Sequence, residues 1–222
     1  MSYQLDPKLE KWVRWSDEVY NETQGLLIKT KLYDDYIEIV KNNPEIQNPR
    51  DFHDWVMRNY YESALMVIRR LVDTNRDCIS LINLLEEIKC YYQLITKEFY
   101  LREYPEGDGV LPATRDYAED RFDEVFSSDG LTLSQEVVEA DISELKKQTE
   151  IVEKFIDNTL AHRNKGPKGK QSIETKHIRT AIQRIEEIAI KYLDLLGKGG
   201  YSELTPTWQY DPAEIFRKAW IS

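Results

Sequence analysis

Two polar residues near the end of a predicted helix are candidates for a functional site, and one of them is a histidine. Asn158 and His162 are four positions apart, so a helix would place them on one face, one turn from each other. A histidine can take or give a proton near neutral pH, which makes His162 a candidate general acid or base. A purely local role is the alternative, because the helix dipole and the last carbonyl groups also favour a histidine near a helix C-terminus.

The charge of the chain changes sign directly after His162. Residues 115–157 contain 13 acids and five bases, whereas residues 163–180 contain six bases and one acid. The bases are Arg163, Lys165, Lys168, Lys170, Lys176 and Arg179, and the acid is Glu174. A basic segment beside a histidine in an acidic protein predicts an anion or phosphate site. A solvated surface loop is the alternative, and the glycine spacing here is not that of a phosphate-binding P-loop.

A second group of bases lies on the helix predicted to begin near Asn48-Pro49. Arg69 and Arg70 lie between the apolar residues Ile68 and Leu71, so at least one of them is expected near the edge of the core. They are candidate binding residues. The structural alternative is ion pairing within the bundle, for example between Arg70 and Asp73 or Asp77.

The remaining chemistry-bearing residues give weaker signals. Glu174 and His177 form one Glu-x-x-His pair, but a dinuclear metal site in a helical bundle needs two such pairs and two further carboxylates. We therefore expect no metal and no cofactor. Cys78 and Cys90 are the only cysteines and form no Cys-x-x-Cys pair, so we expect buried, free thiols in helical segments.

Helical periodicity dominates the elements that must position these residues. Asp6-Pro7 is typical of a helix start, and the pattern continues to Asn43-Pro44, with Gly25 as a candidate break. Further helices are predicted from Asn48-Pro49, over about 81–99, over about 133–163 and over about 173–196. A short acidic helix is predicted over 115–126, a loop over 103–114 and a turn at Asp129-Gly130. The predicted fold is all-α: an antiparallel bundle of about five long helices with a short C-terminal helix.

Composition supports this fold class. The chain has 222 residues, of which 41% are hydrophobic and 32% are charged, with 9 Gly and 8 Pro. Such a chain can bury a core and has few turn residues for an all-β fold. Its net charge of −10 argues against a protein that coats nucleic acid with its whole surface, but not against a local basic site.

We expect one main domain. Residues 1–200 are predicted to form the bundle, and residues 201–222 a tail with a short helix from Asp211-Pro212 that packs on the bundle. The tail aromatics Trp208, Tyr210, Phe216 and Trp220 could instead form a partner surface. No apolar run is long enough for a membrane span, and the first residues lack a signal-peptide pattern, so a cytoplasmic protein without membrane contact is expected.

Several segments in this order resemble one known family. They are residues 55–65 (WVMRNYYESAL), 67–73 (VIRRLVD), 79–85 (ISLINLL) and 158–165 (NTLAHRNK). Over about residues 10–195 the chain resembles the HEPN superfamily and, within it, the abortive-infection AbiU-like branch.

The resemblance implies a helical bundle that dimerises, a role in defence or in a toxin–antitoxin system, and RNA as the target. In many HEPN proteins the dimer joins two Arg-x(4–6)-His motifs into a metal-independent ribonuclease site. His162 would match the motif histidine, Asn158 the polar residue after the motif arginine, and Arg163 would lie beside them. A cognate antitoxin or regulator is an implied partner.

One departure from the pattern divides the functional hypotheses. The motif arginine should fall at 155–157, where this chain has Phe155, Ile156 and Asp157. An aspartate would repel the phosphate rather than stabilise the developing negative charge. Arg163, or Arg69 from another helix, could replace the lost charge. The first hypothesis is a HEPN-type RNA-directed protein with ribonuclease activity; the alternative is a non-catalytic interaction or regulatory module.

Overall fold

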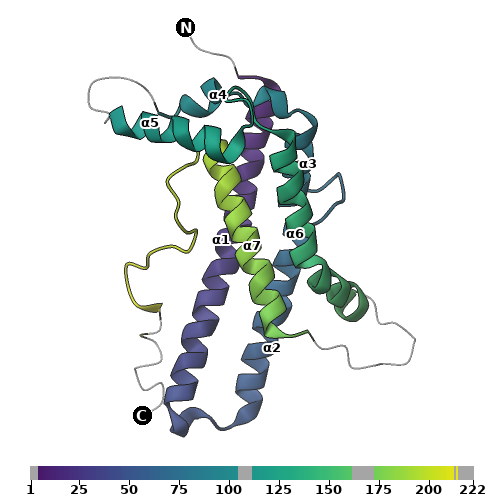
Figure 1. Cartoon of the computed structure of the whole chain (residues 1–222). Coiled ribbons are helices and arrows are strands. Elements are labelled where there is room, and N and C mark those ends of the chain that lie inside the picture. The colour runs from purple at the N-terminus through teal and green to yellow at the C-terminus, as the bar shows by residue number, and fades with distance from the viewer. Residues whose placement is uncertain (1–4, 105–111, 162–172, 213, 215–222) are drawn as a thin grey trace.

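The computed structural model describes residues 5–104, 112–161, 173–212 and 214, and it is helical almost throughout. The long helices are α1 (Pro7–Asn42), α2 (Arg50–Leu71), α6 (Gln135–Ile156) and α7 (Thr175–Leu195). The shorter α3 (Leu81–Cys90) completes the bundle, while α4 (Lys97–Leu101) and α5 (Pro112–Arg121) lie at one end of it (Figure 1). Within the described residues there are isolated β-bridges but no strand. The predicted all-α bundle is confirmed.

The long helices alternate in direction, as short connections require. α1 and α6 run one way, and α2 and α7 run the other (Figure 1). α6 packs mainly on α7, and α1 packs mainly on α2 and α7. Beyond the start of α7, α1 and α2 continue as a two-helix hairpin. This arrangement places the end of α6 beside the C-terminal half of α2.

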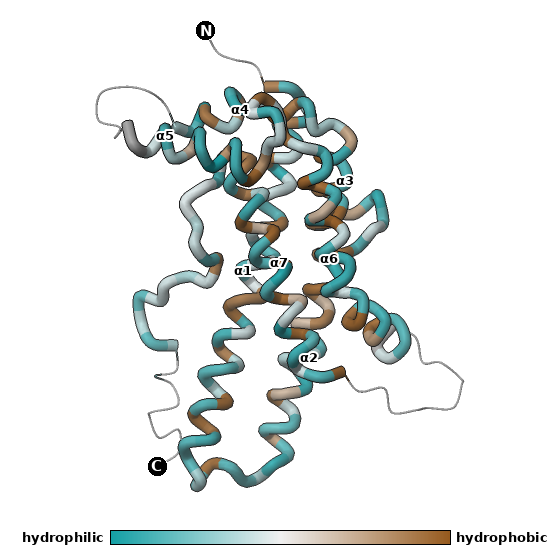
Figure 2. Tube along the Cα trace, viewed as in Figure 1, coloured by the Kyte–Doolittle hydropathy of each residue, from teal (hydrophilic) through white to brown (hydrophobic). Residues whose placement is uncertain are grey.

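One-sided hydrophobic patterns explain the bundle. On α7 every residue predicted to face inward is buried: Ile178, Ile182, Ile185, Ile188, Tyr192 and Leu195. On α6 the apolar stripe has Thr149 in one place, where the hydroxyl donates to the carbonyl of Leu145 at 2.9 Å and so needs no other partner. Hydrophobic and hydrophilic residues alternate along the long helices, and none is apolar throughout (Figure 2). Within the described residues no helix is long and apolar enough to cross a membrane.

The first helix starts as predicted but has no break. The Asp6 carboxylate accepts a hydrogen bond from the Lys8 amide at 2.7 Å, and Pro7 occupies the first turn. Gly25 lies inside the continuous helix. A glycine there costs about 1 kcal/mol relative to alanine, and the buried Leu26 and Leu27 beside it offset that loss.

The predicted single helix over 81–99 is wrong in its second half. α3 ends at Cys90, a short 3-10 turn follows over Tyr92–Leu94, and Ile95 is extended. Thr96 then caps α4, because its hydroxyl accepts from the Phe99 amide at 3.1 Å. The amide of Leu133 donates to the Ile95 carbonyl at 2.9 Å. This tertiary hydrogen bond holds the chain extended where hydrophobic periodicity alone predicts a helix.

The cysteine prediction also needs correction. Both thiols are free, but Cys78 is half-buried in the connection between α2 and α3, and Cys90 is exposed at the end of α3. Cys90 lies on the solvent side of α3, while Leu84, Leu85 and Ile88 fill the core side.

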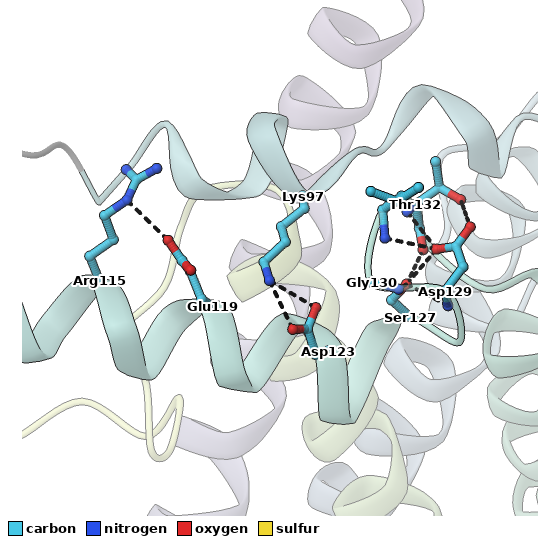
Figure 3. A network of polar contacts seen from close by, with 9 residues as sticks. Lys97, Arg115, Glu119, Asp123, Ser127, Asp129, Gly130 and Thr132 are labelled. Carbon is cyan, nitrogen blue, oxygen red and sulfur yellow. Dashed lines mark hydrogen bonds and ion pairs between the residues drawn. The ribbon is translucent and has the colours of Figure 1, made fainter.

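Polar contacts fix the end of the bundle that carries α5 (Figure 3). The predicted turn at Asp129-Gly130 is confirmed, with Gly130 at φ 72°. The amides of Leu131 and Thr132 donate to the Asp129 carboxylate and hold its pKa at about 2. Lys97 of α4 pairs with Asp123 in the π-helical turn Phe122–Phe126 that follows α5. These contacts join α4, the end of α5 and the turn before α6.

A buried carboxylate ties the same end to α7. Asp194 is 9% exposed at its side chain and accepts from Arg121 Nε at 2.6 Å. The Tyr100 and Tyr104 hydroxyls also donate to it, at 3.3–3.4 Å. Burial and the Asp194 charge raise the pKa of Tyr100, so the phenol stays protonated and remains a donor.

We expect Asp194→Asn to lower the free energy of unfolding by about 3 kcal/mol, because the change leaves the Arg121 guanidinium half-buried without its counter-charge. The measurement is urea unfolding at neutral pH. Asp123→Asn is the matched control, because its ion pair with Lys97 is more exposed and should contribute at most about 1 kcal/mol. Equal losses in the two variants would contradict this account.

The predicted tail begins along the bundle. The Leu204 amide donates to Glu186 of α7 at 3.0 Å, and Leu204 is buried. The Tyr201 ring packs against that of Tyr20 of α1, with centroids 5.5 Å apart and the planes tilted by 33°. Trp208 is half-buried and Tyr210 is exposed. The predicted C-terminal helix is described only at its start, where the Glu214 amide donates to the Asp211 carbonyl at 3.0 Å. The rest of it, including Phe216 and Trp220, lies outside the described residues.

Candidate functional site

The end of α6 changes its helical geometry at the residues singled out from the sequence. Ser134 caps the start of α6, and the regular α-helix ends at Ile156. A π-helical turn follows over Asp157–Ala161. Asn158 lies in this turn, is exposed, and donates through Nδ2 to the Lys154 carbonyl at 2.8 Å. Single π-turns inside helices are frequent at functional sites because they widen the backbone and redirect side chains.

Arg69 comes from the last turns of α2 to the same place. Its Nη1 lies 3.1 Å from Glu153 Oε1, and its Nη2 lies 3.6 Å from Asp157 Oδ1. The guanidinium therefore spans the last turn of α6 and the start of the π-turn. It contacts the residue immediately before Asn158, at the position where the family pattern would carry its arginine.

Charge and burial set the balance of this cluster. Burial raises the pKa of Glu153, the Asp157 charge raises it further, and Arg69 acts in the opposite direction. With both acids ionised, one guanidinium faces two carboxylates. The cluster then carries one net negative charge, and protonation of Glu153 would make it neutral.

Arg70 points elsewhere. Its Nη2 lies 2.7 Å from Glu22 Oε2 of α1. The predicted ion pairing of Arg70 is present, but the partners suggested for it are wrong. Asp73 instead accepts from the Asn75 amide at 2.9 Å and stabilises the connection after α2. Of the two candidate binding arginines, the structure brings only Arg69 to the turn with Asn158.

Most of the predicted basic site falls outside the described residues. His162, Arg163, Lys165, Lys168 and Lys170 all lie there. The two described bases of the segment are paired. Lys176 lies 2.8 Å from Glu174, and Arg179 forms a two-point ion pair with Asp34 of α1. Both therefore have a local structural role.

No metal centre is visible in the part of the chain that the structure describes, since no three His, Cys, Asp or Glu side chains gather there. Glu174 pairs with Lys176 instead of sharing a site with His177. The remaining histidine, His53, forms hydrogen bonds through its ring nitrogens with the Tyr36 hydroxyl and the Ile46 carbonyl. It joins α1, the turn after it and α2.

One known family matches almost the whole chain. The HEPN_AbiU2 family, described as AbiU2, matches residues 9–220. The chain belongs to the HEPN AbiU2 family. It is therefore a HEPN protein of the abortive-infection type, and the match includes α2, α6 and the π-turn. No curated protein and no solved structure is similar enough to add to this comparison.

The position of Arg69 matters because this protein belongs to the HEPN AbiU2 family. The family resemblance directs attention to Asn158, to His162 and to the missing arginine before them. The sequence offered two replacements for the missing arginine, Arg69 and Arg163. No local feature of the sequence favoured one over the other. The described structure supplies the contact of Arg69 with Asp157, and it adds Glu153, which the sequence did not single out.

Proposed function

We propose that this protein is an RNA-directed HEPN protein of a prokaryotic defence or toxin–antitoxin system, and that Arg69 takes the place of the missing motif arginine. The contact between Arg69 and Asp157 carries the proposal. It brings a guanidinium from α2 to the residue immediately before Asn158, and the ribonucleases of the HEPN superfamily carry a motif arginine near this position. Arg69 is 35% exposed at its side chain, so a phosphate can reach it.

The proposed reaction is transesterification within RNA. A base removes the proton of a 2′-hydroxyl, whose oxygen attacks the adjacent phosphorus while the bond from phosphorus to the 5′-oxygen breaks. The leaving oxygen takes a proton, which leaves a 2′,3′-cyclic phosphate and a 5′-hydroxyl. His162 serves in proton transfer, Asn158 orients the phosphate, and Arg69 with Arg163 stabilises the negative charge of the phosphorane.

The basic segment and a second copy extend the site. Lys165, Lys168 and Lys170 would contact neighbouring phosphates, and such contacts position RNA without reading its sequence. A homodimer held in check by a cognate antitoxin or regulator is part of the proposal and is implied by the family resemblance. A cytoplasmic location is proposed from the sequence pattern, which has no long apolar run and no signal-peptide pattern.

One observation favours a non-catalytic role as the second candidate. Arg69 is held by two carboxylates, Glu153 and Asp157, whose combined charge exceeds its own. A phosphate must displace at least one of them before it can pair with the guanidinium. A protein in which that exchange does not occur would act as an interaction or regulatory module on the same fold.

The test is cleavage of single-stranded and structured RNA by the full chain in the presence of a metal chelator. We expect Arg69→Gln to slow cleavage about tenfold, because the amide keeps one donor and loses the charge. Arg184→Gln is the matched control. Arg184 has similar exposure, 36%, and also contacts two carboxylates, Glu144 and Glu187. Absence of cleavage by the unmodified chain would favour the non-catalytic module, and equal rates for both variants would remove Arg69 from the reaction.

A further inference from the structure

A partly apolar groove opens beside the end of α6, on the side away from Arg69. It has a volume of about 490 Å³ and lies between α2, the last turn of α6 and the start of α7. Its walls include two aromatic rings and three aliphatic side chains: Tyr61, Phe155, Met57, Leu65 and Ile178. The volume lies within the range of small-molecule sites, roughly 300–1,000 Å³.

Helix geometry places this groove next to Asn158. Phe155 precedes Asn158 by three residues, so the two occupy adjoining places on the helix surface. Successive residues of an α-helix are about 100° apart, so Phe155 points about 160–200° away from Glu153 and Asp157. Arg69 therefore approaches the turn from one flank, and the groove adjoins it from the other.

The aromatic wall is held in place before any ligand arrives. The Tyr61 hydroxyl lies 2.9 Å from Thr175 Oγ1 at the start of α7. Its ring contacts those of Tyr60 and Tyr33, with centroids 5.1 Å and 5.7 Å away. A ring fixed at both ends loses little entropy when a flat ligand stacks on it.

Arg58 supplies a charge at the rim that is not already engaged. It is exposed, and within the described residues it forms no ion pair. By contrast, Arg69, Arg70, Arg179 and Arg184 are all paired with carboxylates. Asp54 and Glu62 line the same groove one helical turn to either side of Arg58, so hydrogen-bond acceptors and a guanidinium border the same cavity.

We propose that this groove binds one nucleotide of single-stranded RNA, next to the phosphodiester that the protein acts on. The base lies against Tyr61 and Phe155, and the phosphate pairs with Arg58. Asp54 and Glu62 favour bases with an exocyclic amino group, because carboxylates only accept hydrogen bonds. This inference rests on the proposed function and adds a substrate class to it: unpaired RNA whose base beside the site is cytosine, adenine or guanine rather than uracil.

The experiment measures the binding of fluorescently labelled decamers of oligocytidine and oligouridine to the full chain carrying His162→Ala, which keeps the RNA intact. We expect Phe155→Leu to raise the Kd for oligocytidine about tenfold, since base stacking on an aromatic ring contributes roughly 5- to 150-fold in affinity. Arg58→Gln should weaken binding and reduce the slope of log Kd against log salt by about 0.7, the value for one lost phosphate contact on a single strand. Oligouridine should bind more weakly than oligocytidine.

Two matched controls make the result specific. Phe52→Leu changes an exposed ring elsewhere on α2, and Arg14→Gln removes an exposed, unpaired arginine of α1. Both should leave the Kd within about twofold. Because Arg58 is exposed, its variant tests the groove even if Phe155→Leu disturbs the packing of α6.

The outcomes separate this inference from the proposed function. If the groove variants bind RNA as well as the controls do while the unmodified chain still cleaves it, the groove assignment is wrong and the proposed function stands. If the chain neither binds nor cleaves RNA, the proposed function is wrong, and the groove inference that rests on it is wrong as well. If the groove variants change the sedimentation coefficient instead of RNA affinity, the groove is an interface with a second copy, which also overturns the inference.

Discussion

His162→Ala should reduce the rate of metal-free RNA cleavage by about 10²–10⁴-fold, the contribution expected of a general acid or base. In the proposed reaction, this side chain moves a proton between the 2′-hydroxyl or the leaving 5′-oxygen and solvent. Alanine cannot do so, whereas Arg69 and the lysines would still hold the RNA. The rate should therefore fall with little change in Kd. The measurement is single-turnover cleavage of end-labelled RNA in a chelator, with identification of the cyclic phosphate product.

The control for this prediction is His53→Gln. His53 bonds to Tyr36 and to the Ile46 carbonyl in the hairpin of α1 and α2, so its loss affects local stability rather than proton transfer. Cleavage that is unchanged in His162→Ala would exclude a catalytic role for this histidine. Loss of RNA binding in the same variant would instead assign it to substrate binding.

The second large effect is expected from reversing the charges of Arg69 and Asp157. Arg69→Asp should lower cleavage by about 10²–10³-fold, because it removes the stabilising charge and gathers three carboxylates around the phosphate. The double variant Arg69→Asp with Asp157→Arg exchanges the partners of the 3.6 Å ion pair. It also places an arginine where the family pattern expects one. We expect it to recover most of the lost rate.

The exchange distinguishes catalysis from stability. Both single reversals break the ion pair and create like-charge contacts, whereas the double variant restores an opposite pair, and unfolding in urea would report that restoration. Recovery of stability without recovery of cleavage would mean that Arg69 only holds α2 against α6. Cleavage that appears in Asp157→Arg but is absent from the unmodified chain would support the non-catalytic module and would explain its inactivity by the lost arginine.

Local signals determined much of the fold. The Asp6-Pro7 start, the turn at Asp129-Gly130 and the inward face of α7 were all predictable, because capping and amphipathic periodicity act over a few residues. The break between α3 and α4 was not predictable in this way. A hydrogen bond from Leu133, far along the chain, decides the extended conformation of Ile95, and periodicity contains no information about such a partner.

The same division holds for the site. The sequence by itself determined the family and the absence of an arginine at 155–157, and it predicts that Asn158 and His162 lie together. Those features are local, because they depend only on residue types and the helical repeat. The choice of Arg69 rather than Arg70, the part played by Glu153, and the groove at Phe155 came only from the tertiary structure. Arg69 is 88 residues from Asp157 along the chain, and only the packing of α2 across the end of α6 brings the two side chains within 3.6 Å of each other.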